Sequence, residues 1–204
     1  MRRIHILAVP TLAAVALLAG GCGAATYHLR GPSTGFYYGE APPVDQLAAL
    51  DQVVLEPLTA SAPRLKELHE RGSRALAYLS VGEVDRTRPW FSEIKPAWII
   101  GENTAWNSVI LDQGNPEVRA FLLKLAQRFW DQGFRGFFLD TTDSHLLPLG
   151  KKPKEQRVWE AGLVKFIKAL SKRFGGGKIL LNRGFEVLPR VAKVIHGVAA
   201  ESLY

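Results

Sequence analysis

The sequence predicts an α/β protein built from consecutive strand–helix units. Short apolar runs alternate along the chain with amphipathic stretches that repeat at helical spacing. Because these runs are apolar throughout, they suit a parallel sheet that is covered on both faces. With 204 residues, the chain is long enough for one sizeable core, and nothing in its composition requires a second domain.

The first 25 residues are expected to be an export signal that takes no part in the fold. Arg2 and Arg3 precede an apolar segment over residues 4–18, and small residues follow it up to Ala25. This order of basic, apolar and small residues is typical of a signal peptide, and the apolar segment is too short for a permanent membrane span. The mature chain is therefore expected outside the cytoplasm, in the periplasm or anchored to a membrane.

Cys22 is the only cysteine, and it lies where the signal ends, in the run Leu18-Ala-Gly-Gly-Cys22. The run resembles a bacterial lipobox, in which the cysteine becomes the lipidated first residue of the mature protein, although Ala19 stands where leucine is preferred. Ordinary cleavage near Ala24 or Ala25 is the alternative, and the sequence leaves both open. A single cysteine also excludes a disulfide within the chain.

Six apolar runs are the predicted strands, at residues 36–38, 53–55, 76–81, 136–139, 178–181 and 196–200. A closed (β/α)8 barrel needs roughly 250 residues, and the given sequence stops shortly after the sixth run. We therefore expect a TIM-barrel type of α/β fold over residues 26–204, truncated after its sixth strand. An open doubly wound sheet is the alternative, and it requires a reversal in strand order that the sequence does not reveal.

Three helices between these strands are marked by residues that favour helix ends. They are expected between Ser61 and Gly72, between Asn115 and Gly133, and from about Lys154 to Phe174. In the first two, a proline stands in the first turn, where its missing amide proton costs no hydrogen bond. Asn115 is a good N-cap, and glycine is favoured just past a helix end.

The basic composition does not indicate nucleic-acid binding. The formal charge of +7 becomes +5 (7 − 2) once Arg2 and Arg3 leave with the signal. Lys151, Lys152 and Lys154 form the only dense basic cluster, and its position before a predicted helix favours a solvated loop. The positive residues form no nucleic-acid-reading motif, so no nucleic-acid partner is expected.

Acidic residues stand at the C-terminal ends of the predicted strands. Asp140 and Glu201 directly end the fourth and sixth strands, while Glu56 and Glu83 follow the second and third. In a parallel sheet covered by helices, this edge is where ligands bind, and an isolated carboxylate would be costly inside the core. We therefore expect Asp140 and Glu201 to meet at one rim as a carboxylate pair for acid–base hydrolysis.

Other residues are expected to complete an acidic, aromatic-lined rim. Tyr38, Tyr78 and Trp106 offer aromatic faces that suit sugar rings. Asn182 and Arg183 follow the fifth strand and reach the same edge of the sheet. Each aromatic residue also suits ordinary core packing, so the cluster carries more weight than any one member.

Two of the acids have a structural role as their alternative. Asp143, three residues after Asp140, is expected to pair with Arg183 or to bind a neighbouring loop. Glu56, which precedes Pro57, is expected to bind either substrate or a backbone amide.

Competing types of site have weaker support. No two histidines have metal-ligand spacing, although His145 lies near Asp140 and Asp143 and leaves a metal site as a minor alternative. The only cysteine belongs to the signal region, which excludes thiol catalysis. The glycine run at 175–177 lacks the spacing of a phosphate-binding loop.

Seven motifs follow one another along the chain as they do in glycoside hydrolase family 114, the endo-α-1,4-polygalactosaminidases, which the sequence therefore resembles. They are Phe36-Tyr-Tyr38, Val53-Val-Leu-Glu-Pro57, Ala77-Tyr-Leu-Ser-Val-Gly-Glu83, Trp106-Asn-Ser108, Phe138-Leu-Asp-Thr-Thr-Asp-Ser144, Asn182-Arg-Gly-Phe-Glu186 and Ala200-Glu-Ser202. The resemblance covers nearly all of the chain after the signal and is nearest to hydrolase domains of bacterial biofilm exopolysaccharide systems. Thr142 stands where the family usually has leucine, and the two absent strand–helix units are a larger departure.

The resemblance implies a (β/α)8 barrel that cleaves α-1,4-linked galactosamine or N-acetylgalactosamine polymers without a cofactor or metal. It makes Asp140 and Glu201 the catalytic carboxylates. We expect Asp140 to act as the nucleophile and Glu201 as the acid/base of a retaining mechanism, with inversion as the alternative. The residues expected to position sugars are Tyr38, Glu56, Tyr78, Glu83, Trp106, Asp143, Asn182 and Arg183.

The expected partner is a galactosamine-rich polysaccharide bound by a monomer, with a lipid on Cys22 as the means of any membrane anchoring. Two other functions stay open at this point. One is a non-catalytic carbohydrate-binding lipoprotein with an incomplete barrel, and the other is a metal-dependent hydrolase or deacetylase.

Overall fold

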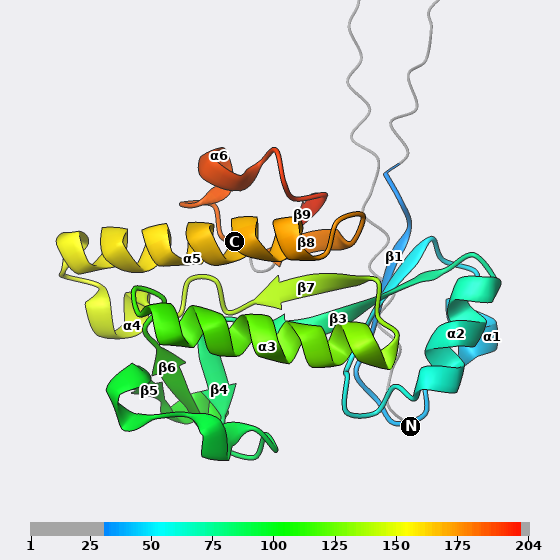
Figure 1. Cartoon of the computed structure of the whole chain (residues 1–204), viewed down its shortest axis with the longest axis horizontal. Helices are drawn as coiled ribbons and strands as arrows, with labels where there is room; N and C mark the ends of the chain where they lie inside the picture. The colour runs from blue at the N-terminus through cyan, green and yellow to red at the C-terminus, as the bar shows by residue number, and fades with distance from the viewer. Residues whose placement is uncertain (1–30, 201–204) are drawn as a thin grey trace, which may run out of the picture.

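The computed structural model describes residues 31–200. The predicted signal over residues 1–25, with Cys22, and the predicted acid/base Glu201 lie outside the described residues. Within the described part, parallel strands with helices between them form one curled sheet (Figure 1). No helix among residues 31–200 is long and apolar enough to cross a membrane.

The curled sheet contains the six predicted strands. They are β1 (Thr34–Tyr37), β2 (Gln52–Leu55), β3 (Arg74–Ser80), β7 (Gly136–Asp140), β8 (Lys178–Asn182) and β9 (Gly197–Ala199). Their order in the sheet is β1-β2-β3-β7-β8-β9, and every neighbouring pair is parallel. Because the order follows the chain without a reversal, the sheet is of the (β/α)8 barrel type, and the doubly wound alternative is wrong.

The helices between these strands include the three that the sequence predicts. They are α1 (Val44–Leu47), α2 (Ala62–Glu70), α3 (Pro116–Gln132), α4 (Leu146–Leu149), α5 (Pro153–Arg173) and α6 (Leu188–Val191). The predicted helices are α2, α3 and α5. Asn115 caps α3 because its side chain accepts a hydrogen bond of 2.9 Å from the amide nitrogen of Glu117. Gly133 ends α3 with a φ of 125°, which glycine adopts without a Cβ clash.

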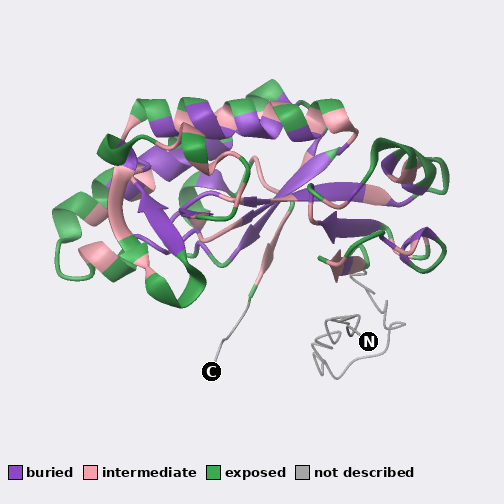
Figure 2. Ribbon diagram, turned by 90° about the horizontal axis from the view of Figure 1, so that it is seen from below, coloured by how far each residue is buried: buried purple, intermediate pink, exposed green. Residues whose placement is uncertain are grey.

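The four central strands of the curled sheet, β2, β3, β7 and β8, are largely buried, whereas the edge strands β1 and β9 are mostly half-buried (Figure 2). On the outer face, helix residues such as Leu122 pack into one large core together with alternate strand residues. On the inner face, Val54, Leu76, Phe138 and Leu180 from four adjacent strands form a separate cluster. An interior filled by apolar side chains from the strands is typical of (β/α) barrels.

A three-stranded antiparallel sheet, which the sequence patterns do not predict, lies between β3 and α3 in the chain (Figure 1). Its strands are β4 (Glu83–Asp85), β5 (Ile99–Asn103) and β6 (Ser108–Leu111), in the order β4-β6-β5. These strands are short, and β5 contains glycine and asparagine, so neither a long apolar run nor a clear alternation marks them. Three short 3-10 turns connect them: η1 (Phe91–Glu93), η2 (Pro96–Trp98) and η3 (Thr104–Trp106).

Candidate active site

Asp140 ends β7, and both neighbouring strands hold its carboxylate in place. The Tyr78 hydroxyl, on β3, donates a hydrogen bond of 2.6 Å to Oδ2, and the Asn182 amide, on β8, donates one of 2.8 Å to Oδ1. Hydrogen bonds that donate to a carboxylate stabilise its negative charge and fix its orientation. The structure therefore places Asp140, Tyr78 and Asn182 together.

The chain turns sharply at the ends of β7 and β8. Thr141 and Arg183, which directly follow Asp140 and Asn182, both have a φ of 60°. A β-branched residue with a positive φ is an unusual and strained conformation, and such strain concentrates at functional sites. The side chain of Thr141 offsets part of the cost, because its Oγ1 accepts a hydrogen bond of 2.8 Å from the amide nitrogen of Gly82.

The close approach at Gly82 leads to a prediction about stability. A Cβ added at Gly82 would lie 2.1 Å from the backbone oxygen of Thr141. Because backbone atoms must shift to relieve this overlap, Gly82→Ala is expected to lower the free energy of unfolding by about 1–3 kcal/mol. Gly175→Ala is the matched control, since its Cβ would meet nothing within 4 Å. Urea denaturation of both variants measures the difference, and equal midpoints would contradict the overlap.

Tyr78 is oriented to act as a hydrogen-bond donor to Asp140. Its ring meets the ring of Tyr38 edge-on, with centroids 5.4 Å apart and an interplanar angle of 77°. Burial, and then the negative charge of Asp140, raise the pKa of Tyr78 above its ordinary value. The hydroxyl of Tyr78 therefore stays protonated and donating at any working pH.

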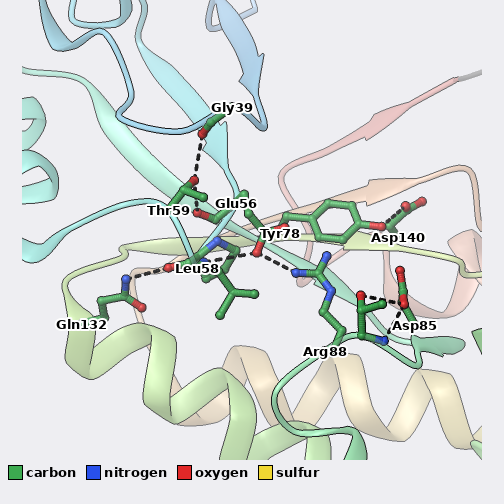
Figure 3. Close-up of polar contacts among 11 residues, drawn as sticks. Gly39, Glu56, Leu58, Thr59, Tyr78, Asp85, Arg88, Gln132 and Asp140 are labelled. Atoms are coloured by element: carbon green, nitrogen blue, oxygen red, sulfur yellow. Dashed lines mark hydrogen bonds and ion pairs between the residues drawn. The ribbon is translucent and has the colours of Figure 1, made fainter.

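Glu56, at the end of β2, is paired with a residue that the sequence analysis did not identify. Its Oε1 accepts a hydrogen bond of 2.7 Å from Nη1 of Arg88 and one of 3.2 Å from the amide nitrogen of Leu58 (Figure 3). The expected bond to a backbone amide is therefore present. Arg88 follows β4 of the unpredicted sheet, so no pattern in the sequence marked it as a site residue.

Glu83 lies inside the protein, where hydroxyl and amide groups surround its carboxylate. It is 6% exposed. Ser108 and Ser144 donate their hydroxyl protons to it, the second at 2.5 Å, and Asn103 donates its amide at 3.2 Å. Glu83 therefore ties the small antiparallel sheet to the loop after β7 instead of presenting a free carboxylate to solvent.

The other predicted site residues are partly or largely exposed. Asp143 and Arg183 form the expected ion pair, with Oδ2 and Nη2 3.0 Å apart. Tyr38 is half-exposed, and Trp106, on η3 between β5 and β6, is 74% exposed. With Arg88 and Arg183 paired to Glu56 and Asp143, the rim is less acidic than the positions of its carboxylates alone suggest.

His145 is buried against an aromatic ring. Its imidazole stacks on Trp159 with ring centroids 4.1 Å apart, and burial lowers its pKa, although nearby acids led by Glu160 oppose that shift. Among residues 31–200, no three His, Cys, Asp or Glu side chains are arranged to hold a metal ion.

The model of glycoside hydrolase family GH114 matches residues 23–204. The glycoside hydrolase domain of PelA from Pseudomonas aeruginosa is 38% identical and superimposes with a TM-score of 0.76, over 85% of this chain and 69% of that one. Ega3 from Aspergillus fumigatus, solved in complex with galactosamine, is 17% identical with a TM-score of 0.65, over 81% of this chain and 64% of that one.

A more distant structure shares the fold alone. The α-galactosidase TtGalA from Thermus thermophilus is 20% identical with a TM-score of 0.56, over 76% of this chain and 36% of that one. No match was found among curated protein sequences. The family match extends over nearly the whole chain. The sequence identity to the PelA domain is well above the level at which two proteins share only a fold. The chain therefore belongs to glycoside hydrolase family GH114 and is a glycoside hydrolase.

Proposed function

We propose that this chain is an extracytoplasmic, endo-acting hydrolase of α-1,4-linked galactosamine and N-acetylgalactosamine polymers. The observation that carries the proposal is the carboxylate of Asp140, held at a strand end by donors from both neighbouring strands. The family match and the galactosamine in the Ega3 structure support the substrate class.

In the proposed reaction, Asp140 is the nucleophile and Glu201 the acid/base. The Asp140 carboxylate attacks the anomeric carbon to form a glycosyl ester, while Glu201 gives its proton to the departing glycosidic oxygen. Glu201 then removes a proton from a water molecule, whose oxygen attacks the anomeric carbon and releases Asp140. Two displacements at one carbon retain its configuration.

The strand order supports a pairing of these two residues. β7 and β9 flank β8, and Glu201 comes two residues after β9 ends at Ala199. Neighbouring strands lie about 4.8 Å apart, so β7 and β9 are separated by about 10 Å. On the concave face of a curled sheet, side chains from different strands approach one another. Retention requires carboxyl groups about 5–5.5 Å apart, whereas inversion requires about 6.5–9.5 Å.

The test uses purified protein with acetylated and deacetylated α-1,4-galactosaminoglycan. We expect new reducing ends and a ladder of intermediate oligomers, because an endo-acting enzyme cleaves within the chain. Proton NMR of the first products reports retention or inversion. Binding of the polymer without new reducing ends would instead favour a carbohydrate-binding protein, and loss of cleavage in EDTA would favour a metal-dependent hydrolase.

We also propose export by the signal over residues 1–25, with Cys22 as the site of lipid attachment, and a monomeric protein. The basic, apolar and small residues of that segment support export. Mass spectrometry of the mature N-terminus distinguishes a lipidated Cys22 from ordinary cleavage near Ala25.

A further inference from the structure

We infer that Arg88 is a positioning residue of this active site, which holds Tyr78, and through Tyr78 the nucleophile Asp140, in the reactive arrangement. The inference rests on the role of Asp140 under the proposed function. It concerns a side chain from the loop that follows β4 of the small antiparallel sheet, and it gives that loop a part in catalysis (Figure 3).

Arg88 makes contact with two parts of the barrel rim at once. Its Nη1 donates to Glu56 at 2.7 Å, and its guanidinium carbon lies 6.0 Å from the centre of the Tyr78 ring. The hydroxyl of the same tyrosine donates to Asp140 at 2.6 Å. Three consecutive contacts therefore connect the end of β2, through Arg88 and Tyr78, to the carboxylate at the end of β7.

The Arg88 side chain is held by contacts with Glu56, Tyr78 and Trp90. The ring of Trp90 lies 5.5 Å from its guanidinium carbon, on the same loop. The ion pair is largely shielded from solvent, because the side chains of Arg88 and Glu56 are 23% and 13% exposed. A flat guanidinium that is both hydrogen-bonded and packed on aromatic faces is a rigid support, which a lysine would reproduce only in part because it keeps the charge and lacks the planar fork.

The charge on Arg88 persists at every working pH. Burial lowers the pKa of Arg88, but the hydrogen bond to Glu56 and the nearby negative charges outweigh it, so the pKa rises above its ordinary value. The loop that carries Arg88 is braced as well. The amide nitrogen of Arg88 donates to the backbone oxygen of Asp85 at 3.0 Å, and the hydroxyl of Thr87 donates to the Asp85 carboxylate at 2.9 Å.

These contacts indicate that Glu56 and Arg88 support the site and do not bind the substrate directly. The Oε1 atom of Glu56 is already engaged by Arg88 and by the amide nitrogen of Leu58. Arg88 touches Tyr78 and Glu56 and acts on the reacting carboxylate only through Tyr78. Its removal should therefore affect the rate of the chemical step more than the binding of the polymer.

The first experiment compares Arg88→Met with Arg86→Met. Arg86 lies two residues away, forms an ion pair of 2.6 Å with Glu102 and packs 5.7 Å from the Phe91 ring. It therefore shares with Arg88 an acidic partner and an aromatic neighbour, although its ion pair is more exposed, and the aromatic ring is not that of Tyr78. Because a misplacement of about 1 Å can cost about 100-fold in rate, we expect Arg88→Met to lower kcat about 10- to 100-fold with little change in KM. Arg88→Lys should recover part of this loss, and Arg86→Met should match the wild type.

A second measurement needs no substrate, so it separates failure of this inference from failure of the proposed function. The short hydrogen bond between Tyr78 and Asp140 should give a downfield hydroxyl proton in the NMR spectrum, identified by its loss in Tyr78→Phe. We expect Arg88→Met to broaden or remove this resonance and Arg86→Met to leave it unchanged. If the wild type cleaves no galactosamine polymer, the proposed function fails while the NMR comparison still tests the inference.

Two outcomes would overturn the inference. One is an unchanged hydroxyl resonance in Arg88→Met, and the other is a rise in KM with kcat intact, which indicates direct binding of substrate. Since Arg88→Met removes the ion-pair partner of the largely buried Glu56 carboxylate, loss of folding is a separate effect to control. The double variant Arg88→Met/Glu56→Gln removes both charges, and it carries the same predictions for kcat and for the resonance.

Discussion

Replacing Asp140 by asparagine is expected to lower kcat on a galactosamine polymer by at least about 10⁴-fold. Asparagine has nearly the same shape and keeps an oxygen that accepts the hydrogen bond donated by Asn182 at 2.8 Å. Its amide oxygen is a far weaker nucleophile than a carboxylate, so the glycosyl ester does not form. The loss should fall on kcat, while affinity for an oligosaccharide changes little.

Asp131→Asn is the matched control for this variant. Asp131 lies exposed on α3, where it accepts a hydrogen bond of 2.8 Å from Gln127, so this change should leave both kcat and KM unaltered. Reducing-end assays measure the rates, and isothermal titration with a short oligosaccharide measures affinity. Wild-type turnover in a folded Asp140→Asn variant would remove Asp140 from the reaction.

Glu201→Gln is expected to lower kcat on the polymer by about 10²- to 10⁴-fold, the usual contribution of a general acid or base. The proposed role of Glu201 is to protonate a poor leaving group, the oxygen of the next sugar. An aryl glycoside with a good leaving group needs no such proton. Formation of the glycosyl ester should therefore be nearly normal in Glu201→Gln when the substrate is an aryl glycoside.

The two variants should thus differ in their response to the leaving group. With an aryl glycoside, Glu201→Gln should show a burst of aryl alcohol followed by slow turnover, because the same residue activates water in the second step. Asp140→Asn should show no burst with either substrate. A burst in Asp140→Asn and none in Glu201→Gln would exchange the two roles.

The sheet and the long helices were predictable because their signals are local. Each of the six parallel strands contains a continuous apolar run, and α2 and α3 have capping residues, such as Asn115, at the expected ends. The position of Asp140 at a strand end followed from the same patterns. So did the ion pair between Asp143 and Arg183, which face each other because β7 and β8 are neighbours.

The small antiparallel sheet was missed because its strands are too short to show a period. The sequence analysis therefore also missed the burial of Glu83 and the ion pair between Arg88 and Glu56. Each of these features depends on a partner that is distant in the sequence. Glu56, for example, precedes its partner Arg88 by 32 residues. No pattern within a short window contains that information.

The strand–helix alternation and the placement of Asp140 at a strand end followed from the sequence alone. These follow from apolar periodicity and helix capping, which act over a few residues. The groups that hold each carboxylate became known from the folded structure: Tyr78 and Asn182 for Asp140, Arg88 for Glu56, and three donors for Glu83. The reason is that the electrostatic environment of a carboxylate depends on groups within a few ångströms in space, and only folding brings those groups together.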